Sequence, residues 1–398
     1  MMRSRSFPAY VTRQAERALR KLASTSPIIA ITGPRQSGKT TLAINAFPGF
    51  TYTNLEEPDT RMLVTRDPRS FLSGLAGGAI IDEAQRVPNL FSYLQAHVDT
   101  RRRGGQFILT GSSQFVLNER ITQSLAGRVA YLHLLPFAWS ELSESGHAPE
   151  SIEDAMFEGS FPPVHARAAD PRQWYRDYVA TYVERDVRQL IRVVDIDAFQ
   201  QFVRLCAHWT GQLLNLTRMA ADCGISANTA KAGLGVLRAS YIVHLLHPHH
   251  VNFRKRLVKS PKLHFLDSGM AAQLLSIQQP ADLRTHPMRG ALFESWLVSE
   301  LLKGRFNRGL ADNIYFWRSQ SGDEIDVLAD HGTTLQPIEC KSGRTVAADW
   351  FDGIAKWSEW AGSKVEAPCL VYGGDRPANH RGVKVLPWRD IESLAAVV

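Results

Sequence analysis

The sequence predicts an α/β fold that begins with a parallel sheet and a phosphate-binding loop. Residues 33–40 read GPRQSGKT, which fits the pattern G-x-x-x-x-G-K-[ST] at every position. An apolar run at 28–31 precedes the loop, and a segment of helical character at 41–44 follows it. Strands are expected at 28–32, 51–55, 79–82, 106–111 and 129–135, with helices between them. Such alternation favours a parallel sheet that carries helices on both faces.

The loop has the chemistry of a phosphate cradle. Its glycines let backbone N–H groups close around a β-phosphate, and the helix N-terminus that follows favours an anion. Lys39 adds a point charge, and Thr40 offers a hydroxyl to Mg²⁺. The predicted nucleotide-binding residues are Gly33, Pro34, Arg35, Gln36, Ser37, Gly38, Lys39, Thr40 and Thr41.

A second motif, at residues 77–83, is a short apolar strand that ends in two carboxylates, Asp82 and Glu83. Many buried strands end in acids, but this one follows the loop by about forty residues, as expected in a P-loop enzyme. We expect this strand to lie beside the P-loop strand and Asp82 to hold Mg²⁺ through a water molecule. Glu83 is then the candidate base that polarises the attacking water.

Two further features point toward the γ-phosphate. The fourth predicted strand ends in Ser112 and Ser113, where a polar side chain could touch the γ-phosphate or the attacking water. Arg128 lies just before the fifth strand, and it is either a finger that reaches a neighbour's nucleotide or an ordinary surface salt bridge.

The middle of the chain is expected to be helical from about 136 to 190 and to hold a winged helix-turn-helix between 212 and 243. The turn at 223–226 and a Ser226 N-cap suit this motif. Residues 244–262 then carry five basic residues and no acid: Arg254, Lys255, Arg256, Lys259 and Lys262. Such a wing could contact DNA phosphates, although winged helices also dock proteins.

The third part, from about residue 261, contains a second candidate site. Strands are expected at 321–328 and 337–341, and symmetry about 332–333 would set Asp326 across from Glu339. Glu339 and Lys341 share a face while Cys340 points away, and Glu294 lies on a nearby amphipathic helix. Asp326, Glu339 and Glu294 could ligate a metal and Lys341 could manage the attacking water, as in a phosphodiester hydrolase. The alternative is a structural ion-pair cluster around a strand pair.

Composition narrows the function classes. The chain has 398 residues and a formal net charge of +7, which leans toward a polyanionic partner. Its four cysteines form no C-x-x-C pair, which suits a reducing cytoplasm. The first ten residues include no apolar signal region, and no run is long enough to span a membrane, so we expect a cytoplasmic protein without membrane partners.

Taken together, the chain resembles a prokaryotic AAA-family P-loop ATPase of the type with a C-terminal domain of unknown function. The resemblance rests on the order of the segments GPRQSGKTTL, AIIDEAQ, FILTGSSQF, SLAGRV, PKLHFLDSGM, RGALFESWLVSEL, GDEIDVL and IECKSG. It implies an AAA+ core at 1–140, a helical lid and winged helix-turn-helix at 141–260, and a restriction-endonuclease-like (PD-(D/E)xK) domain at 261–398.

The same resemblance implies ATP with Mg²⁺ as cofactors, Mn²⁺ being possible at the nuclease-like site, and a homo-oligomer, often a hexameric ring. It assigns Asp82 and Glu83 to the Walker B acids, Ser112 or Ser113 to the sensor and Arg128 to the finger position. Glu294, Asp326, Glu339 and Lys341 fit the nuclease pattern.

Two classes of function remain open from the sequence. The first is an oligomeric motor or remodeller on duplex or branched DNA, with metal-dependent cleavage as an added activity. The second is a signalling, regulatory or toxin-type defence ATPase that uses its C-terminal domains for binding without cleavage.

Overall fold

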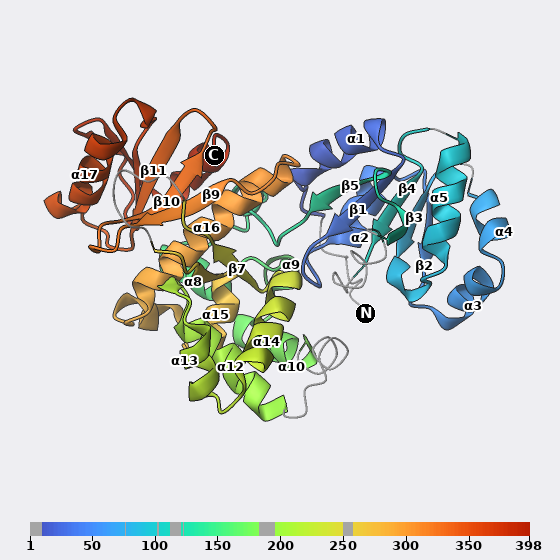
Figure 1. Cartoon of the computed structure of the whole chain (residues 1–398), viewed down its shortest axis with the longest axis horizontal. Coiled ribbons are helices and arrows are strands. Elements are labelled where there is room, and N and C mark those ends of the chain that lie inside the picture. The colour runs from blue at the N-terminus through green and yellow to red at the C-terminus, as the bar shows by residue number, and fades with distance from the viewer. Residues whose placement is uncertain are drawn as a thin grey trace, which may run out of the picture.

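The computed structural model describes residues 10–75, 77–101, 103–111, 121, 123–182, 196–249 and 258–398. The first body, on the right in Figure 1, is a sheet flanked by helices. Its strands are β1 (Ile28–Thr32), β2 (Thr51–Asn54), β3 (Ala79–Asp82), β4 (Phe107–Thr110) and β5 (Val129–His133). Its helices are α1 (Ala15–Thr25), α2 (Lys39–Ala46), α3 (Pro58–Arg66), α4 (Pro68–Ser73) and α5 (Leu90–Arg101), with a 3₁₀ turn at Ala84–Arg86.

This sheet is parallel throughout, in the order β2-β3-β4-β1-β5. The prediction that the strand ending in Asp82 lies beside the P-loop strand is wrong, because β4 lies between β3 and β1. All five residues of β1 are buried. Ile28 and Ala30 pack into one apolar cluster, and Ile29 and Ile31 pack into another. A strand covered on both faces reads as a continuous apolar run, which is why the sequence located it.

The middle of the chain is mainly helical. Its helices are α7 (Trp139–Glu144), α8 (Ile152–Glu158), α9 (Pro162–Ala166), α10 (Pro171–Tyr182), α12 (Ile196–His208), α13 (Leu216–Asp222), α14 (Ala227–Ala239) and α15 (Ser268–Leu274). Between α13 and α14 the chain makes the predicted turn, and the Ser226 hydroxyl accepts a 3.1 Å hydrogen bond from the Thr229 N–H. That bond satisfies one of the free donors at the start of α14.

A small antiparallel sheet accompanies these two helices. Its order is β6 (Gln212–Leu213), β8 (Lys262–Phe265), β7 (Val243–Leu246). Strand β8 begins after the predicted boundary at residue 260, yet it pairs with both strands that precede that boundary. The elements around α13 and α14 therefore extend past residue 260.

The C-terminal part, at the upper left in Figure 1, is a six-stranded mixed sheet with helices. The strands are β9 (Ile314–Arg318), β10 (Glu324–Asp330), β11 (Leu335–Lys341), β12 (Cys369–Tyr372), β13 (Ala378–His380) and β14 (Val383–Pro387). The helices are α16 (Arg289–Asn307), α17 (Asp352–Ala361) and α18 (Ile391–Ala395), and short 3₁₀ turns lie at Pro280–Arg284, Ala348–Phe351, Gly362–Lys364 and Trp388–Asp390. In the β10–β11 hairpin Val327 is opposite Ile338, so the same register sets Asp326 opposite Glu339, as predicted.

Helix α16 connects the two ends of the molecule. It contacts α1 and β5 of the first body, and also β8 and β11. Figure 1 shows it running from the C-terminal sheet toward the first body. No described helix is both long and apolar enough to cross a membrane.

Candidate nucleotide site and carboxylate cluster

The P-loop runs from the carboxyl end of β1 into α2. Gly33 lies against the backbone just after β5, and a Cβ at this position would come within 2.0 Å of the Leu134 carbonyl oxygen. Gly38 has φ +92°, which favours glycine, and it serves as the N-cap of α2. The Lys39 ammonium is folded onto the loop and donates to the carbonyls of Gly33 (2.9 Å) and Pro34 (2.6 Å). An incoming phosphate would take over this ammonium.

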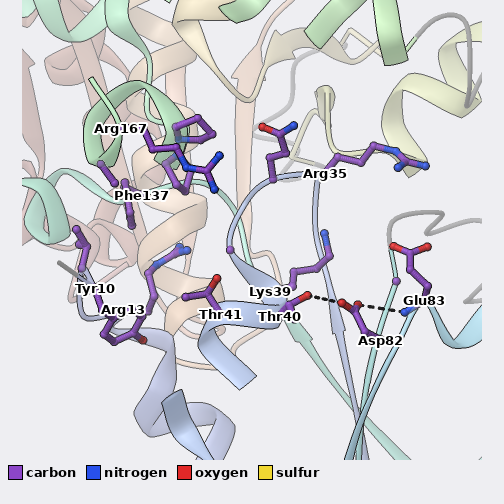
Figure 2. Close-up of a pocket in the computed structure, with 17 residues that line it drawn as sticks. Tyr10, Arg13, Arg35, Lys39, Thr40, Thr41, Asp82, Glu83, Phe137 and Arg167 are labelled. Atoms are coloured by element: carbon purple, nitrogen blue, oxygen red, sulfur yellow. Dashed lines mark hydrogen bonds between the residues drawn. The ribbon is translucent and has the colours of Figure 1, made fainter. Parts of the chain in front are cut away.

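The side chain of Asp82 lies at the foot of the loop, where Figure 2 shows it facing Thr40. The Thr40 hydroxyl donates to Asp82 Oδ2 at 2.9 Å. Tyr52 donates to the same oxygen at 3.1 Å, and the Thr110 hydroxyl donates to Oδ1. Burial and the nearby Asp82 raise the pKa of Tyr52, so its phenol stays a donor. One carboxylate therefore ties β2, β3, β4 and α2 together.

This pair of oxygen ligands fits Mg²⁺. A magnesium ion at a P-loop keeps several waters and takes one hydroxyl, one carboxylate and the phosphates rather than a cage of side chains. Thr40 and Asp82 are in hydrogen-bonding contact, and both line the pocket in which phosphates would lie. The ion would supply charge neutralisation to the bound phosphates.

Glu83 follows Asp82 and lines the same pocket. Its backbone has φ +55°, a conformation that costs about 1–3 kcal/mol for a residue other than glycine. The Gln85 side-chain amide donates to Glu83 Oε2 at 2.6 Å and holds the carboxylate in place. The base assignment of Glu83 remains a prediction, and its position beside the P-loop is compatible with it.

The pocket continues beyond the P-loop into a region that sequence reasoning missed and that is lined mostly by apolar and aromatic side chains. Its volume is about 550 Å³, and it is lined beyond the P-loop by Tyr10, Val11, Phe137, Pro162, Pro163, Ala166 and Arg167. These residues come from the segment before α1, the stretch after β5 and the region of α9, so no local motif marks them. A nucleobase needs such an apolar wall. Figure 2 shows Phe137 and Arg167 on the side of the pocket away from Glu83.

Arg13 is a further residue that sequence reasoning missed. It is buried, and its guanidinium donates to the Ser37 carbonyl (2.7 Å), to the Leu135 carbonyl (2.7 Å) and to the Glu141 carboxylate (3.0 Å). The only sequence signal is a basic residue ahead of the first predicted strand, a signal shared by many surface arginines. Arg13 fixes the outer face of the P-loop from a distant part of the chain.

The structure places Arg128 far from the P-loop. Arg128 forms an ion pair with Asp99 at 2.6 Å. It precedes Val129, which is opposite Ile28 at the start of β1, so it lies at the end of the sheet away from the P-loop. It cannot act on its own chain's nucleotide, and its role at a neighbour's site stays a prediction. Ser112 and Ser113 lie outside the described residues; the residue before them, Gly111, lines the pocket.

The C-terminal residues named from the sequence do come together. The Lys341 ammonium lies 2.8 Å from Glu339 Oε2 and 3.7 Å from Asp326 Oδ2, while Asp326 Oδ2 accepts the Cys340 N–H at 3.0 Å. Burial and the adjacent Asp326 carboxylate raise the pKa of Glu339. Burial alone would raise the pKa of Asp326. The nearby ammonium groups of Lys262 and Lys341 outweigh this effect and hold the pKa below its usual value.

The sequence predicts a basic wing that includes Lys262, whereas the structure buries this lysine in the carboxylate cluster. Its ammonium lies 2.7 Å from Glu294 Oε1 and 2.5 Å from Glu324 Oε1, a carboxylate that sequence reasoning did not assign to the site. Burial raises the pKa of Glu294 to about 7 even with this partner. Among the described residues, no group of three or more His, Cys, Asp or Glu side chains is arranged to hold a metal ion. The metal roles of Glu294, Asp326 and Glu339 remain predictions that the arrangement does not favour.

Comparisons with known proteins agree with the nucleotide site. Residues 25–143 match the family described as AAA domain, while residues 149–281 and 289–391 match two domains of unknown function (DUF8612 and DUF4143). The uncharacterized protein Rv2008c of Mycobacterium tuberculosis is 31% identical over 324 residues, which cover 80% of this chain and 71% of the relative. Mb2031c of Mycobacterium bovis matches to the same extent.

Two solved structures match the chain with low sequence identity and low TM-scores. The Walker-type ATPase PABY2304 of Pyrococcus abyssi has 15% identity and a TM-score of 0.46, covering 66% of this chain and 95% of that one. A RuvB variant of Thermotoga maritima has 17% identity and a TM-score of 0.29, covering 58% and 86%.

The AAA-domain match spans the P-loop, Asp82 and Glu83, the residues that the structure gathers around one pocket. Such a domain uses ATP, with Mg²⁺ as the usual metal. The chain is a P-loop ATPase with an AAA domain, and it belongs to the family of the uncharacterized protein Rv2008c of Mycobacterium tuberculosis.

Proposed function

We propose that this ATPase acts on DNA, and that ATP hydrolysis at the P-loop is coupled to DNA held by a winged helix-turn-helix made of α13, α14 and the β6-β8-β7 sheet. The observation that carries the proposal is a contact between Tyr241, which follows α14, and Thr32, the last residue of β1 before the P-loop. The DNA contacts proposed for α14 and the nucleotide contacts expected at the P-loop would thus be only a few residues from a shared hydrogen bond.

The contact is a closed triad of polar side chains. The Tyr241 hydroxyl lies 3.1 Å from Thr32 Oγ1 and 2.8 Å from His133 Nδ1, and Thr32 Oγ1 lies 2.6 Å from the same nitrogen. Burial lowers the pKa of His133, which favours the neutral ring. Tyr241 has φ +56°, a strained backbone that persists only where its surroundings enforce it. A shift of α14 would therefore be felt at the end of β1.

The outward face of α14 supports DNA as the ligand. Its exposed residues include Asn228, Lys231 and Arg238, and the exposed Arg218 lies on α13. No acidic residue lies within α14. Lysine and arginine side chains on such a helix can contact phosphates, and an asparagine can read a base edge. The basic segment with Arg254, Lys255 and Arg256 lies outside the described residues, and its contribution to DNA binding stays part of the proposal.

The proposal includes an oligomer, with a hexameric ring as the expected form. Arg128 is too far from its own P-loop to serve it, since it lies at the opposite end of the sheet. An arginine there would act on the nucleotide of a neighbouring copy, and its ion pair with Asp99 would be exchanged for phosphate contacts. Cleavage of the bound DNA is not part of the proposal, because the Lys262 ammonium already lies among the carboxylates of the C-terminal cluster.

DNA binding is tested by titrating labelled duplex and forked DNA with the full chain over a series of salt concentrations. Wild type should bind with a steep salt dependence, and Lys231→Ala with Arg238→Ala should lower the log–log slope by about one per lost phosphate contact. Lys384→Ala, an exposed lysine on β14, is the matched control and should leave the slope unchanged. No binding by wild type, or equal slopes in all three proteins, would favour a signalling or regulatory ATPase that binds proteins.

A further inference from the structure

The carboxylate cluster of the C-terminal part is larger than the sequence indicated. Glu294 comes from α16, Glu324 and Asp326 come from β10, and Glu339 comes from β11. The fold family suggested by the sequence would place a divalent metal ion among such acids. The cationic side chains that already lie among these acids decide whether a metal ion can bind there.

Lys262 reaches this cluster from β8 with a side chain that is 4% exposed. Its ammonium lies 2.7 Å from Glu294 Oε1, 2.5 Å from Glu324 Oε1 and 4.0 Å from Asp326 Oδ1. The ammonium is thus in direct contact with two carboxylates, and its charge also faces Asp326. A divalent ion would need oxygens from the same carboxylates at about 2.0–2.6 Å, which the ammonium prevents.

The other carboxylates of the cluster also have cationic partners among the side chains of the chain itself. Lys341 contacts Glu339 and Asp326, and Arg318 lies 3.0 Å from Glu324 Oε2. Three cationic side chains thus face four carboxylates. A buried group of charges is tolerated when each member has partners, and this cluster has them without an added ion.

His264 supplies an independent observation. It lies two residues after Lys262 on β8, is fully buried, and has an Nε2 atom without a hydrogen-bond partner 3.7 Å from Glu294 Oε1. The Nδ1 atom of the same ring is 3.0 Å from the Ser295 hydroxyl. If Lys262 were shortened, the carboxylate oxygens around its ammonium would lose their cation, and one of them, Glu294 Oε1, lies 3.7 Å from this ring nitrogen. Such a donor set suits Mn²⁺.

We propose that the ammonium of Lys262 takes the place of a divalent metal ion in this cluster, so that the C-terminal domain holds its partner without cutting it. The cluster then has a structural role and connects neighbouring elements of the fold. Because β8 belongs to the sheet beside the helix-turn-helix, Lys262 fastens that sheet to α16 and β10. The lysine is the reason that acids in a nuclease-like arrangement need no metal.

The test is Mn²⁺ binding to the nucleotide-free full chain, measured by electron paramagnetic resonance. All proteins carry Asp82→Asn, which removes the metal ligand at the P-loop. The background protein, with this change alone, should show no saturable Mn²⁺ binding. Lys262→Ala in the same background should gain one Mn²⁺ per chain, and Mn²⁺ should raise its lowered melting temperature. Lys262→Arg keeps a cation in place and should gain none.

Saturable Mn²⁺ binding by the background protein that disappears in Asp326→Asn would overturn the proposal. So would nicking of plasmid or forked DNA by wild type with Mg²⁺ or Mn²⁺ that is lost in Asp326→Ala. If Lys262→Ala does not fold, the double variant Lys262→Ala with Glu294→Gln, which removes one charge of each sign, takes its place. The Mn²⁺ measurement on the Asp82→Asn protein decides the question in either case. Neither assay reads DNA-dependent ATP hydrolysis, so this proposal and the proposed function can fail separately.

Discussion

The guanidinium of Arg13 donates a 2.7 Å hydrogen bond to the carbonyl oxygen of Ser37, within the P-loop. In a trans peptide the C=O and the following N–H point in opposite directions. Holding the Ser37 carbonyl toward Arg13 therefore aims the Gly38 N–H away from it, into the loop where a β-phosphate would bind. Glu141 neutralises the guanidinium at 3.0 Å, so Arg13 acts through the peptide plane more than through its charge.

Arg13→Gln is expected to weaken ADP and ATP binding by about tenfold, equivalent to roughly 1.4 kcal/mol, because the loop loses one fixed N–H donor. AMP, which lacks the β-phosphate, should lose much less affinity. The measurement is the ratio of AMP to ADP dissociation constants by calorimetry, with Arg20→Gln, an exposed arginine on α1, as the control. An unchanged ratio alongside a lower melting temperature would make Arg13 a purely structural residue.

Lys39→Ala should weaken nucleotide binding, because it removes the ammonium that is folded onto the loop where the phosphates would bind. Glu83→Gln should still bind ATP but hydrolyse it slowly, since an amide cannot polarise water as a carboxylate does. Steady-state phosphate release together with nucleotide affinity separates the two effects. Turnover like that of wild type in Glu83→Gln would remove Glu83 from the reaction.

Arg128→Ala should reduce turnover by about three orders of magnitude with little change in ATP affinity, as expected for a finger supplied to a neighbour. Mixing it with Glu83→Gln subunits should restore part of the activity, because one intact composite site can form between the two variants. Asp99→Asn removes the same surface ion pair and is the control. Normal turnover by Arg128→Ala, or by a strict monomer, would rule out the finger.

Charge reversal at Arg254, Lys255 and Arg256 should lower DNA affinity for many sequences alike and reduce the salt slope by about one for each lost phosphate contact. Filter binding or fluorescence anisotropy over a range of salt measures both. Unchanged binding would move the DNA surface to another part of the chain.

The sequence predicted those features that depend on short stretches of chain. The buried strand β1 is a continuous apolar run, the P-loop is a contiguous motif, and Ser226 caps a helix three residues from its partner Thr229. The Asp326–Glu339 pairing also followed from sequence, because strand alternation and one turn position fix the hairpin register.

Features that join distant segments could not be obtained in this way. The position of β4 between β1 and β3 depends on the topology of the whole sheet. Arg13 meets its P-loop partner across 24 residues and Glu141 across 128, and both bonds are set by tertiary packing. Lys262 looked like one more residue in a basic stretch, whereas its burial depends on how β8 packs against α16 and β10.

The most direct test of the account is the ATPase rate of the intact chain with and without duplex or forked DNA, measured for wild type and for Tyr241→Phe. The account predicts that DNA raises the wild-type rate, and that the ratio of the two rates falls toward one in Tyr241→Phe, which loses the hydroxyl contact to Thr32. A wild-type rate that is the same with and without every DNA substrate would contradict it.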